Sequence, residues 1–113
     1  MASSTKRPAQ VKIVGKVYKV RVVTERADGF EDGDYGDCDN DQLVIRIIAG
    51  RSIANDQDTL LHEILHAIEF QMGLDGAINK KVSVEQRIQG TATGLLAVMK
   101  DNPALVRFLT RKT

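Results

Sequence analysis

The chain changes character near residue 50, and this change constrains its fold more than any other feature. Residues 11–23 and 43–49 are rich in Val and Ile, as β-strands are. From about residue 55 the apolar residues recur at helical spacing, and breaks follow at Gly73 and at the run 101–103. Strands that come first and helices that follow predict an α+β fold.

The first half predicts a hairpin and one further strand. The hairpin strands are expected over residues 11–14 and 17–23, with the turn at Gly15-Lys16. Residues 27–42 are dense in Asp and Gly and are expected to be a loop. Residues 43–49 would form the third strand. We therefore expect a small antiparallel sheet of about three strands.

The first predicted helix follows this sheet. Asn55 or Asp56 can cap its N-terminus, and Asp58 in the first turn favours the helix dipole. The helix should end near Met72, because Gly73 is a typical residue just past a helix end. The two histidines of the chain fall in the middle of this helix.

A second helix and a short last helix complete the predicted domain. Ser83 and Gln86 have the spacing of a capping box, and the helix should reach about Lys100. The break at residues 101–103 separates it from a short helix over residues 104–110. We expect a disordered tail over residues 1–9 and a single small domain over residues 10–113.

Composition and charge exclude several classes of protein. The net charge is +1, so neither nucleic acid nor an anionic membrane is an expected partner. No window approaches the roughly 20 apolar residues of a membrane span, and residues 1–10 carry no apolar signal sequence. A lone cysteine, Cys38, excludes an intramolecular disulfide and suits a reducing compartment. We expect a cytoplasmic protein.

The acidic loop has a spacing that resembles a calcium site. Asp37, Asp39 and Asp41 alternate as in the opening of an EF-hand loop. That loop would also require glycine at Gln42 and a bidentate acid at Ile48, and the chain has neither. The segment is therefore interpreted as a solvated loop, and Cys38 within it as a passive small residue.

The run LHEILHAI holds both histidines of the chain. His62 and His66 lie one helical turn apart on the same face, where both imidazoles can bind one metal ion. Glu63 is offset around the helix, beside the metal and outside its ligand set, as a general base is. The alternative is a pair of core histidines satisfied by hydrogen bonds. Apolar neighbours predict a buried helix, and a dication would compensate all three buried polar groups.

Two histidines leave the predicted site without its third protein ligand. Stepping back three residues from Ile88 along an apolar stripe of the second helix gives Glu85, so its carboxylate is expected on the buried face. The alternative is a first-turn glutamate favoured by the helix dipole. Glu69 is expected to orient a histidine or to be solvated, and Asp75 and Asp101 are weaker candidates.

The HExxH run followed by Glu85, 19 residues after His66, resembles the gluzincin pattern of zinc metallopeptidases. The wider run TLLHEILHAI, the glycine after the helix and the DNP near residue 102 are similar to small phage-encoded and ImmA/IrrE-like metallopeptidases. The resemblance covers roughly residues 43–103. It implies that residues 10–113 form a minimal zincin-like metallopeptidase domain and that the protein, if viral, acts in the host cytoplasm. It also implies one zinc ion per chain, held by His62, His66 and Glu85, with Glu63 as the catalytic base and a peptide or protein as substrate.

The resemblance also implies where a substrate would lie. The strand before the active-site helix would be a sheet edge that pairs with an extended peptide, which assigns substrate binding to Ile47, Ile48 and Ala49. Larger members of the family use a further Tyr or His to stabilise the transition state. No histidine remains for this role, so Tyr35 is the expected residue, with Tyr18 and Arg87 as the other candidates.

Three functions remain open from the sequence. The expected one is zinc-dependent hydrolysis of peptide bonds by a water molecule that Glu63 activates. The alternative is a zinc-stabilised binding or regulatory module of viral origin that cleaves nothing. A nucleic-acid binder that uses the seven Lys and Arg among residues 1–26 is the least favoured, because a recognition helix and stacking aromatic residues are missing.

Overall fold

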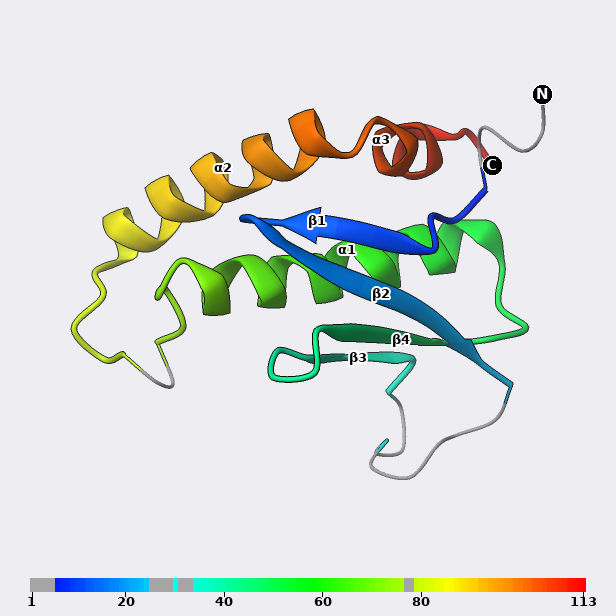
Figure 1. The fold of residues 1–113 in the computed structure, drawn as a ribbon, viewed down its shortest axis with the longest axis horizontal. Helices are drawn as coiled ribbons and strands as arrows, with labels where there is room; N and C mark the ends of the chain where they lie inside the picture. Colours follow the sequence, from blue (N-terminus) through cyan, green and yellow to red (C-terminus); the bar gives the residue numbers. More distant parts are fainter. Residues whose placement is uncertain (1–5, 25–29, 31–33, 77–78) are drawn as a thin grey trace.

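A computed structural model describes residues 6–24, 30, 34–76 and 79–113. It confirms the α+β class: a four-stranded mixed sheet is packed against helices that follow it in the chain (Figure 1). The elements in chain order are β1 (Gln10–Ile13), β2 (Lys16–Val23), β3 (Gly36–Asp39), β4 (Val44–Ile48), α1 (Ile53–Gln71), α2 (Val84–Asp101) and α3 (Pro103–Thr110).

The sheet differs from the prediction in two respects. Its strand order is β1-β2-β4-β3, and β2 pairs with β4 in parallel, whereas the other two pairs are antiparallel. The fourth strand, β3, lies inside the segment predicted to be a loop. Its sequence GDCD has no β-forming pattern of its own, and it is a strand because it pairs with β4, with Cys38 opposite Ile45.

The predicted hairpin is confirmed, with its turn one residue earlier. Val14 and Gly15 both have positive φ, +49° and +84°, as the central residues of a type I′ turn do. This turn has the twist that joins two antiparallel strands tightly, so β1 and β2 are connected by two residues.

Helix α1 covers one face of the sheet and forms the core with it (Figure 1). Its N-cap is Ser52, whose Oγ accepts a hydrogen bond from the Asn55 backbone N–H, and not Asn55 or Asp56 as predicted. The predicted stop is confirmed, because α1 ends at Gln71 and Gly73 has φ +70°. The largest fully buried side chains of the core are Tyr18, Phe108, Ile13, Ile45, Ile47, Leu60, Ile64, Ile68, Leu105, Val11 and Val98.

The segment just before β1 is held against the domain. Arg7 forms an ion pair with Asp56, which is 3% exposed. The Ala9 carbonyl accepts a hydrogen bond from the Val20 N–H. The predicted disordered tail therefore does not extend to residue 9, and residues 1–5 of that prediction lie outside the described part. Asp56 is an internal ion-pair partner of the tail instead of a helix cap.

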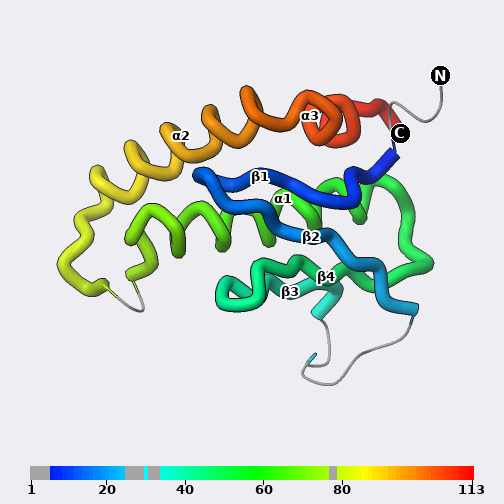
Figure 2. Tube along the Cα trace, in the orientation of Figure 1, coloured from blue at the N-terminus to red at the C-terminus, as the bar shows by residue number. Residues whose placement is uncertain are grey.

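The edge of the sheet at β1 is covered from the C-terminal half of the chain. Asn102, between α2 and α3, accepts a hydrogen bond from the Lys12 N–H and donates one to the Lys12 carbonyl, at 2.9 and 2.7 Å. The chain path in Figure 2 shows how α2 and α3 return along this side of the molecule. A side-chain amide thus takes the place of a further strand at β1, which protects the edge from pairing with another chain.

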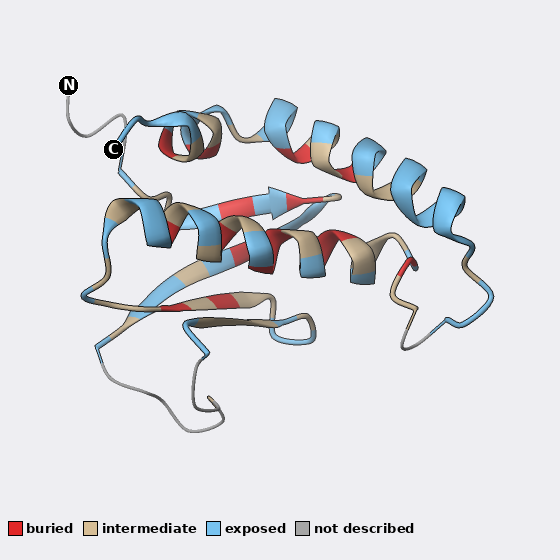
Figure 3. Ribbon diagram, turned by 180° about the vertical axis from the view of Figure 1, so that it is seen from behind, coloured by how far each residue is buried: buried red, intermediate tan, exposed pale blue. Residues whose placement is uncertain are grey.

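Helix α2 packs closely on α1 at Gly94. The predicted capping box is confirmed, with Ser83 and Gln86 bonded reciprocally. A Cβ atom at Gly94 would lie 2.5 Å from Ile68 Cγ2, so only glycine allows the two helices this close. The opposite side of α2 is exposed in Figure 3. No helix in the described ranges is both long and apolar enough to span a membrane.

Candidate functional site

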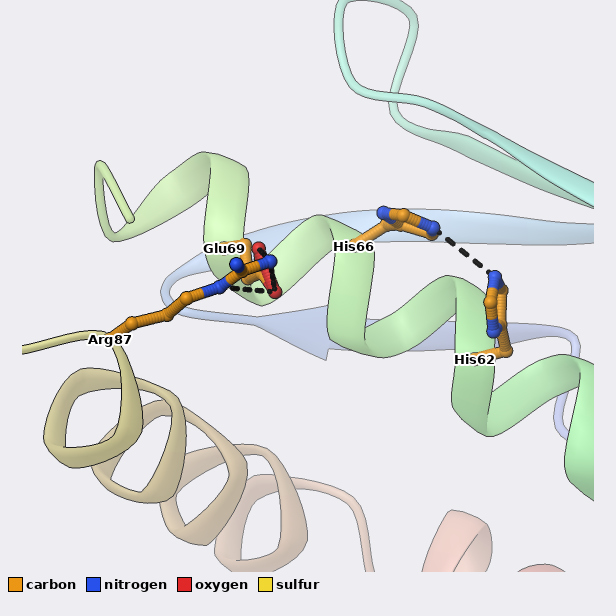
Figure 4. A network of polar contacts seen from close by, with 4 residues as sticks. All are labelled: His62, His66, Glu69 and Arg87. Atoms are coloured by element: carbon orange, nitrogen blue, oxygen red, sulfur yellow. Dashed lines mark hydrogen bonds and ion pairs between the residues drawn. The ribbon is translucent and has the colours of Figure 1, made fainter. Parts of the chain in front are cut away.

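The two histidines project from α1 toward a common point. Their Nε2 atoms are 3.2 Å apart, and the rings meet edge to face with centroids 4.8 Å apart (Figure 4). Both side chains are exposed. The prediction that His62 and His66 share a face is confirmed. The premise that their imidazoles are buried is wrong, because they lie on the side of α1 that faces away from the core.

This separation fits a shared metal ion. Two ligands at ~2.0–2.1 Å from a tetrahedral zinc ion lie about 3.3 Å apart, which is close to the observed value. The same distance also suits a single hydrogen bond between neutral imidazoles, in which one ring donates and the other accepts. The distance between the two Nε2 atoms is therefore compatible with a shared zinc ion.

Glu63 differs from the histidines because it is buried. It is 6% exposed and occupies the core-facing side of α1, between Leu60 and Ala67. Burial raises the pKa of the Glu63 carboxyl above its ordinary value; the nearby His62 and His66 lower it, and acidic neighbours raise it further. A carboxylate with a raised pKa accepts protons more readily near neutral pH, as a general base must.

Glu63 and His62 line a pocket of about 270 Å³ between α1 and the segment that leads into β3. The backbone comes close here because of Gly36, where a Cβ atom would lie 2.7 Å from Thr59 Cγ2 and 2.9 Å from the Arg46 carbonyl oxygen. Tyr35 lies at the same pocket. The pocket therefore joins the predicted base, one predicted ligand and the predicted transition-state residue.

Of the three candidates for transition-state stabilisation, only Tyr35 lines this pocket. Its ring is stacked against the Arg51 guanidinium, 3.7 Å from the ring centroid, and Arg51 also donates to Thr59. Tyr18 is fully buried and hydrogen-bonded to other side chains. Arg87 is paired with Glu69, which lies beyond His66 toward the C-terminal end of α1 (Figure 4).

The surroundings of Glu63 are rich in negative charge. Asp34 and Asp37 both act on its carboxyl, and Cys38 is close enough to be affected by Glu63 in turn. Arg46 compensates Asp37 through an ion pair. A cation at the histidines would therefore sit in a favourable potential.

Cys38 provides a test of this environment. Burial, followed by the charges of Glu63, Asp37 and Asp39, raises the pKa of the Cys38 thiol to about 12. Relative to a free thiol with a pKa of ~8.5, the thiolate fraction at pH 8 falls by roughly a thousandfold. We expect iodoacetamide to label Cys38 of the folded protein at pH 8 that much more slowly than the urea-unfolded protein, measured by mass spectrometry. Equal rates would contradict the buried, acidic setting.

The third predicted ligand is not where the sequence placed it. Glu85 is exposed, and it lies nine residues, or about 2.5 turns, before Gly94, which puts it on the side of α2 opposite to α1. The apolar stripe that placed Glu85 on a buried face is itself exposed. Within the described residues, no three His, Cys, Asp or Glu side chains are grouped so as to hold a metal ion.

Glu69 has a defined partner. Both of its carboxylate oxygens accept hydrogen bonds from Arg87 Nη2, at 2.9 and 2.7 Å (Figure 4). Neither role expected for it, orientation of a histidine or solvation, describes this pair, which joins α1 to the first turns of α2.

The strand assigned to substrate binding is not at an edge. Strand β4 lies between β2 and β3, and Ile47 is fully buried. The backbone N–H groups of Ile48 and Ala49 already donate to the Tyr35 and Val23 carbonyls, at 2.9 and 2.8 Å. The assignment of Ile47, Ile48 and Ala49 to substrate binding is therefore wrong, because the unpredicted strand β3 takes the edge position.

Sequence reasoning also missed the residues that shape the pocket. Gly36 lies against Thr59 and close to Glu63, and Arg51 donates a hydrogen bond to Thr59. Of these three residues, only Gly36 had a sequence signal, as a glycine within the acidic segment. No family model, no curated protein and no solved structure matches this chain.

Proposed function

We propose that the protein is a zinc-dependent metallopeptidase whose centre is His62, Glu63 and His66. The observation that carries the proposal is the 3.2 Å separation of the two Nε2 atoms beside a buried carboxylate with a raised pKa. The two imidazoles are the protein ligands that the described residues offer, and water would complete the coordination. The third-ligand assignment to Glu85 is not part of the proposal, because that side chain faces away from α1.

The zinc ion, Glu63 and the pocket residues have different tasks in the proposed reaction. Zinc, when bound, supplies a Lewis acid that polarises a peptide carbonyl and lowers the pKa of a coordinated water to ~7. Glu63 takes a proton from the attacking water and later delivers it to the leaving amine. The pocket beside Glu63 would hold the residue at the scissile bond, and Tyr35 at its wall would donate a hydrogen bond to the developing oxyanion.

The position of β3 supports a peptide as substrate. This strand is an edge of the sheet, runs into the pocket through Tyr35 and Gly36, and contacts α1. The opposite edge, β1, is covered by Asn102. Among the described residues no further strand pairs with the outer side of β3. An extended peptide can pair with such an edge by main-chain hydrogen bonds, which would place its carbonyls alongside the base.

Metal binding by the histidines is the first test. We expect elemental analysis and titration calorimetry to find about one zinc per chain, as a mononuclear site requires. His62→Ala and His66→Ala should each lower the zinc affinity by about 100-fold or more, because a single imidazole remains. Glu85→Gln is the matched control and should bind zinc as the parent protein does. Unchanged zinc binding in His66→Ala would overturn the site.

A second candidate function has its own supporting observation. Only two metal-ligating side chains converge in the part of the chain that the structure describes. This arrangement also suits a binding module that holds a metal ion and cleaves nothing. The two functions differ in one measurement, because only the first predicts that purified protein with zinc cleaves members of a peptide library.

A further inference from the structure

Helix α2 carries an apolar stripe on the side that faces away from α1. Its exposed apolar residues are Val84 (76% exposed), Ile88 (59%), Leu96 (49%) and Met99 (39%). Ala92, also exposed, lies midway between Ile88 and Leu96. Intervals of three and four residues align these side chains along one side of a helix. Figure 3 shows this side as exposed along most of α2. A contiguous apolar surface of this kind marks an interaction site.

We propose that the stripe binds the same stripe of a second copy, so that two α2 helices pack antiparallel about a twofold axis near Ala92. The order of the residues is symmetrical about this point. Ile88 lies four residues before Ala92 and Leu96 four residues after it. A twofold axis therefore places Ile88 against Leu96 of the partner subunit, and Val84 near Met99 of the partner subunit. Such self-complementarity is what an isologous interface requires.

The charges at the two ends of the stripe favour this orientation. Glu85 lies at the start of α2 and Lys100 at its end, and both are exposed. Antiparallel packing brings Glu85 next to Lys100 of the partner subunit, and does so twice. Parallel packing would bring each charge next to its own copy, which is unfavourable. The charge pattern thus matches a second copy of this chain in one orientation.

The centre of the stripe allows close contact. Ala92 lies at the crossing point, and its own small side chain does not hold the two helices apart. A shallow groove beside Ala92 is lined by Arg87, Ile88, Thr91, Ala92 and Leu95. Small residues at a crossing permit an interaxial distance near the lower end of the usual 8–10 Å. Leu96 of the partner subunit would fill this groove.

The first experiment measures self-association of the 113-residue chain. We expect sedimentation equilibrium to show a monomer–dimer equilibrium in the micromolar range. Ile88→Glu and Leu96→Glu should each raise the dissociation constant by about tenfold or more, because the substituted carboxylate would be buried in the dimer. Val17→Glu, which replaces an exposed apolar residue of β2, is the matched control and should leave association unchanged. A monomer at every concentration would overturn the proposal.

The second experiment tests the orientation and does not depend on the apolar variants. Glu85→Lys and Lys100→Glu should each weaken the dimer, and the double exchange should restore it. Under oxidising conditions Ala92→Cys should form an intermolecular disulfide, since residue 92 lies at the twofold axis. Glu85→Cys should not, because the two copies of residue 85 lie at opposite ends of the interface. A parallel pair would cross-link through residue 85 as well as through residue 92, so a disulfide between the two copies of Glu85→Cys would overturn the antiparallel interface.

Discussion

Replacement of Glu63 by glutamine should lower the rate of peptide hydrolysis by about a hundred- to ten-thousandfold, the usual contribution of a general base. Glutamine fills the same space in the core-facing position but cannot accept the proton of the attacking water. The histidines are untouched, so zinc content should equal that of the parent protein. The measurement is the initial rate on a fluorogenic peptide library with zinc present, together with elemental analysis of the same sample.

Two controls separate catalysis from folding. Glu69→Gln changes a carboxylate on the same helix that pairs with Arg87, and the rate of peptide hydrolysis by this variant should fall far less.

The second control is the free energy of unfolding measured as a function of pH. Since the pKa of Glu63 is raised in the folded protein, its contribution to the free energy of unfolding is largest below about pH 4.3 and declines as the pH rises through the folded pKa. The metal-free glutamine variant should therefore equal or exceed the parent protein in stability at pH 7. A variant that hydrolyses peptides at the parent rate would remove Glu63 from the mechanism.

Substitution of Gly94 by alanine should lower the free energy of unfolding by about 1–2 kcal/mol. The added Cβ would meet Ile68 Cγ2 at 2.5 Å, and Ile68 is fully buried and β-branched, so it has no other rotamer to adopt easily. Overpacking of this kind costs about 1–3 kcal/mol, of which the better helix propensity of alanine offsets up to about 1 kcal/mol. Urea unfolding followed by circular dichroism measures the difference.

Gly90 provides the matched control one turn earlier on α2. A Cβ atom there would lie 2.5, 2.9 and 3.2 Å from Cδ1, Cδ2 and Cγ of Leu74, a side chain that lies in the segment between α1 and α2 and not within a helix. Because Leu74 is not β-branched and lies outside α1, its side chain can shift more easily than that of Ile68, so Gly90→Ala should cost less free energy of unfolding than Gly94→Ala. If Gly94→Ala proved as stable as Gly90→Ala, close packing of α2 on α1 would not depend on the missing side chain.

Local signals explain which parts of the fold could be predicted. The hairpin, the capping box at Ser83 and the helix stop at Gly73 depend on residues near one another in the chain. Strand β3 could not be predicted, because Asp37 and Cys38 adopt a strand only through pairing with β4. The parallel pairing of β2 and β4 likewise depends on contacts between distant segments.

The predictions about the site likewise divide into those that depend on one helix and those that depend on how distant elements pack. The shared face of His62 and His66 follows from the period of one helix, and this prediction is confirmed. The position of Glu85 depended on the rotation of α2 about its own axis. That helix has an apolar stripe at Ile88 and a glycine face at Gly94, and periodicity alone favours the stripe as the buried side. Close approach through glycine, which adds no hydrophobic signal, decides the orientation instead.

The parallel pair at the centre of the sheet has a consequence for folding kinetics. Its partners, such as Val20 and Ile45, are 25 residues apart, whereas Val11 and Tyr18 of the hairpin are seven apart. Loop closure over the longer distance is slower, so we expect the hairpin to form early and the β2–β4 pair late. The segment that closes last also brings Tyr35 and Gly36 to α1. The pocket beside Glu63 would then be among the last parts of the molecule to assemble, and longer connections between β2 and β3 would delay activity more than they reduce stability.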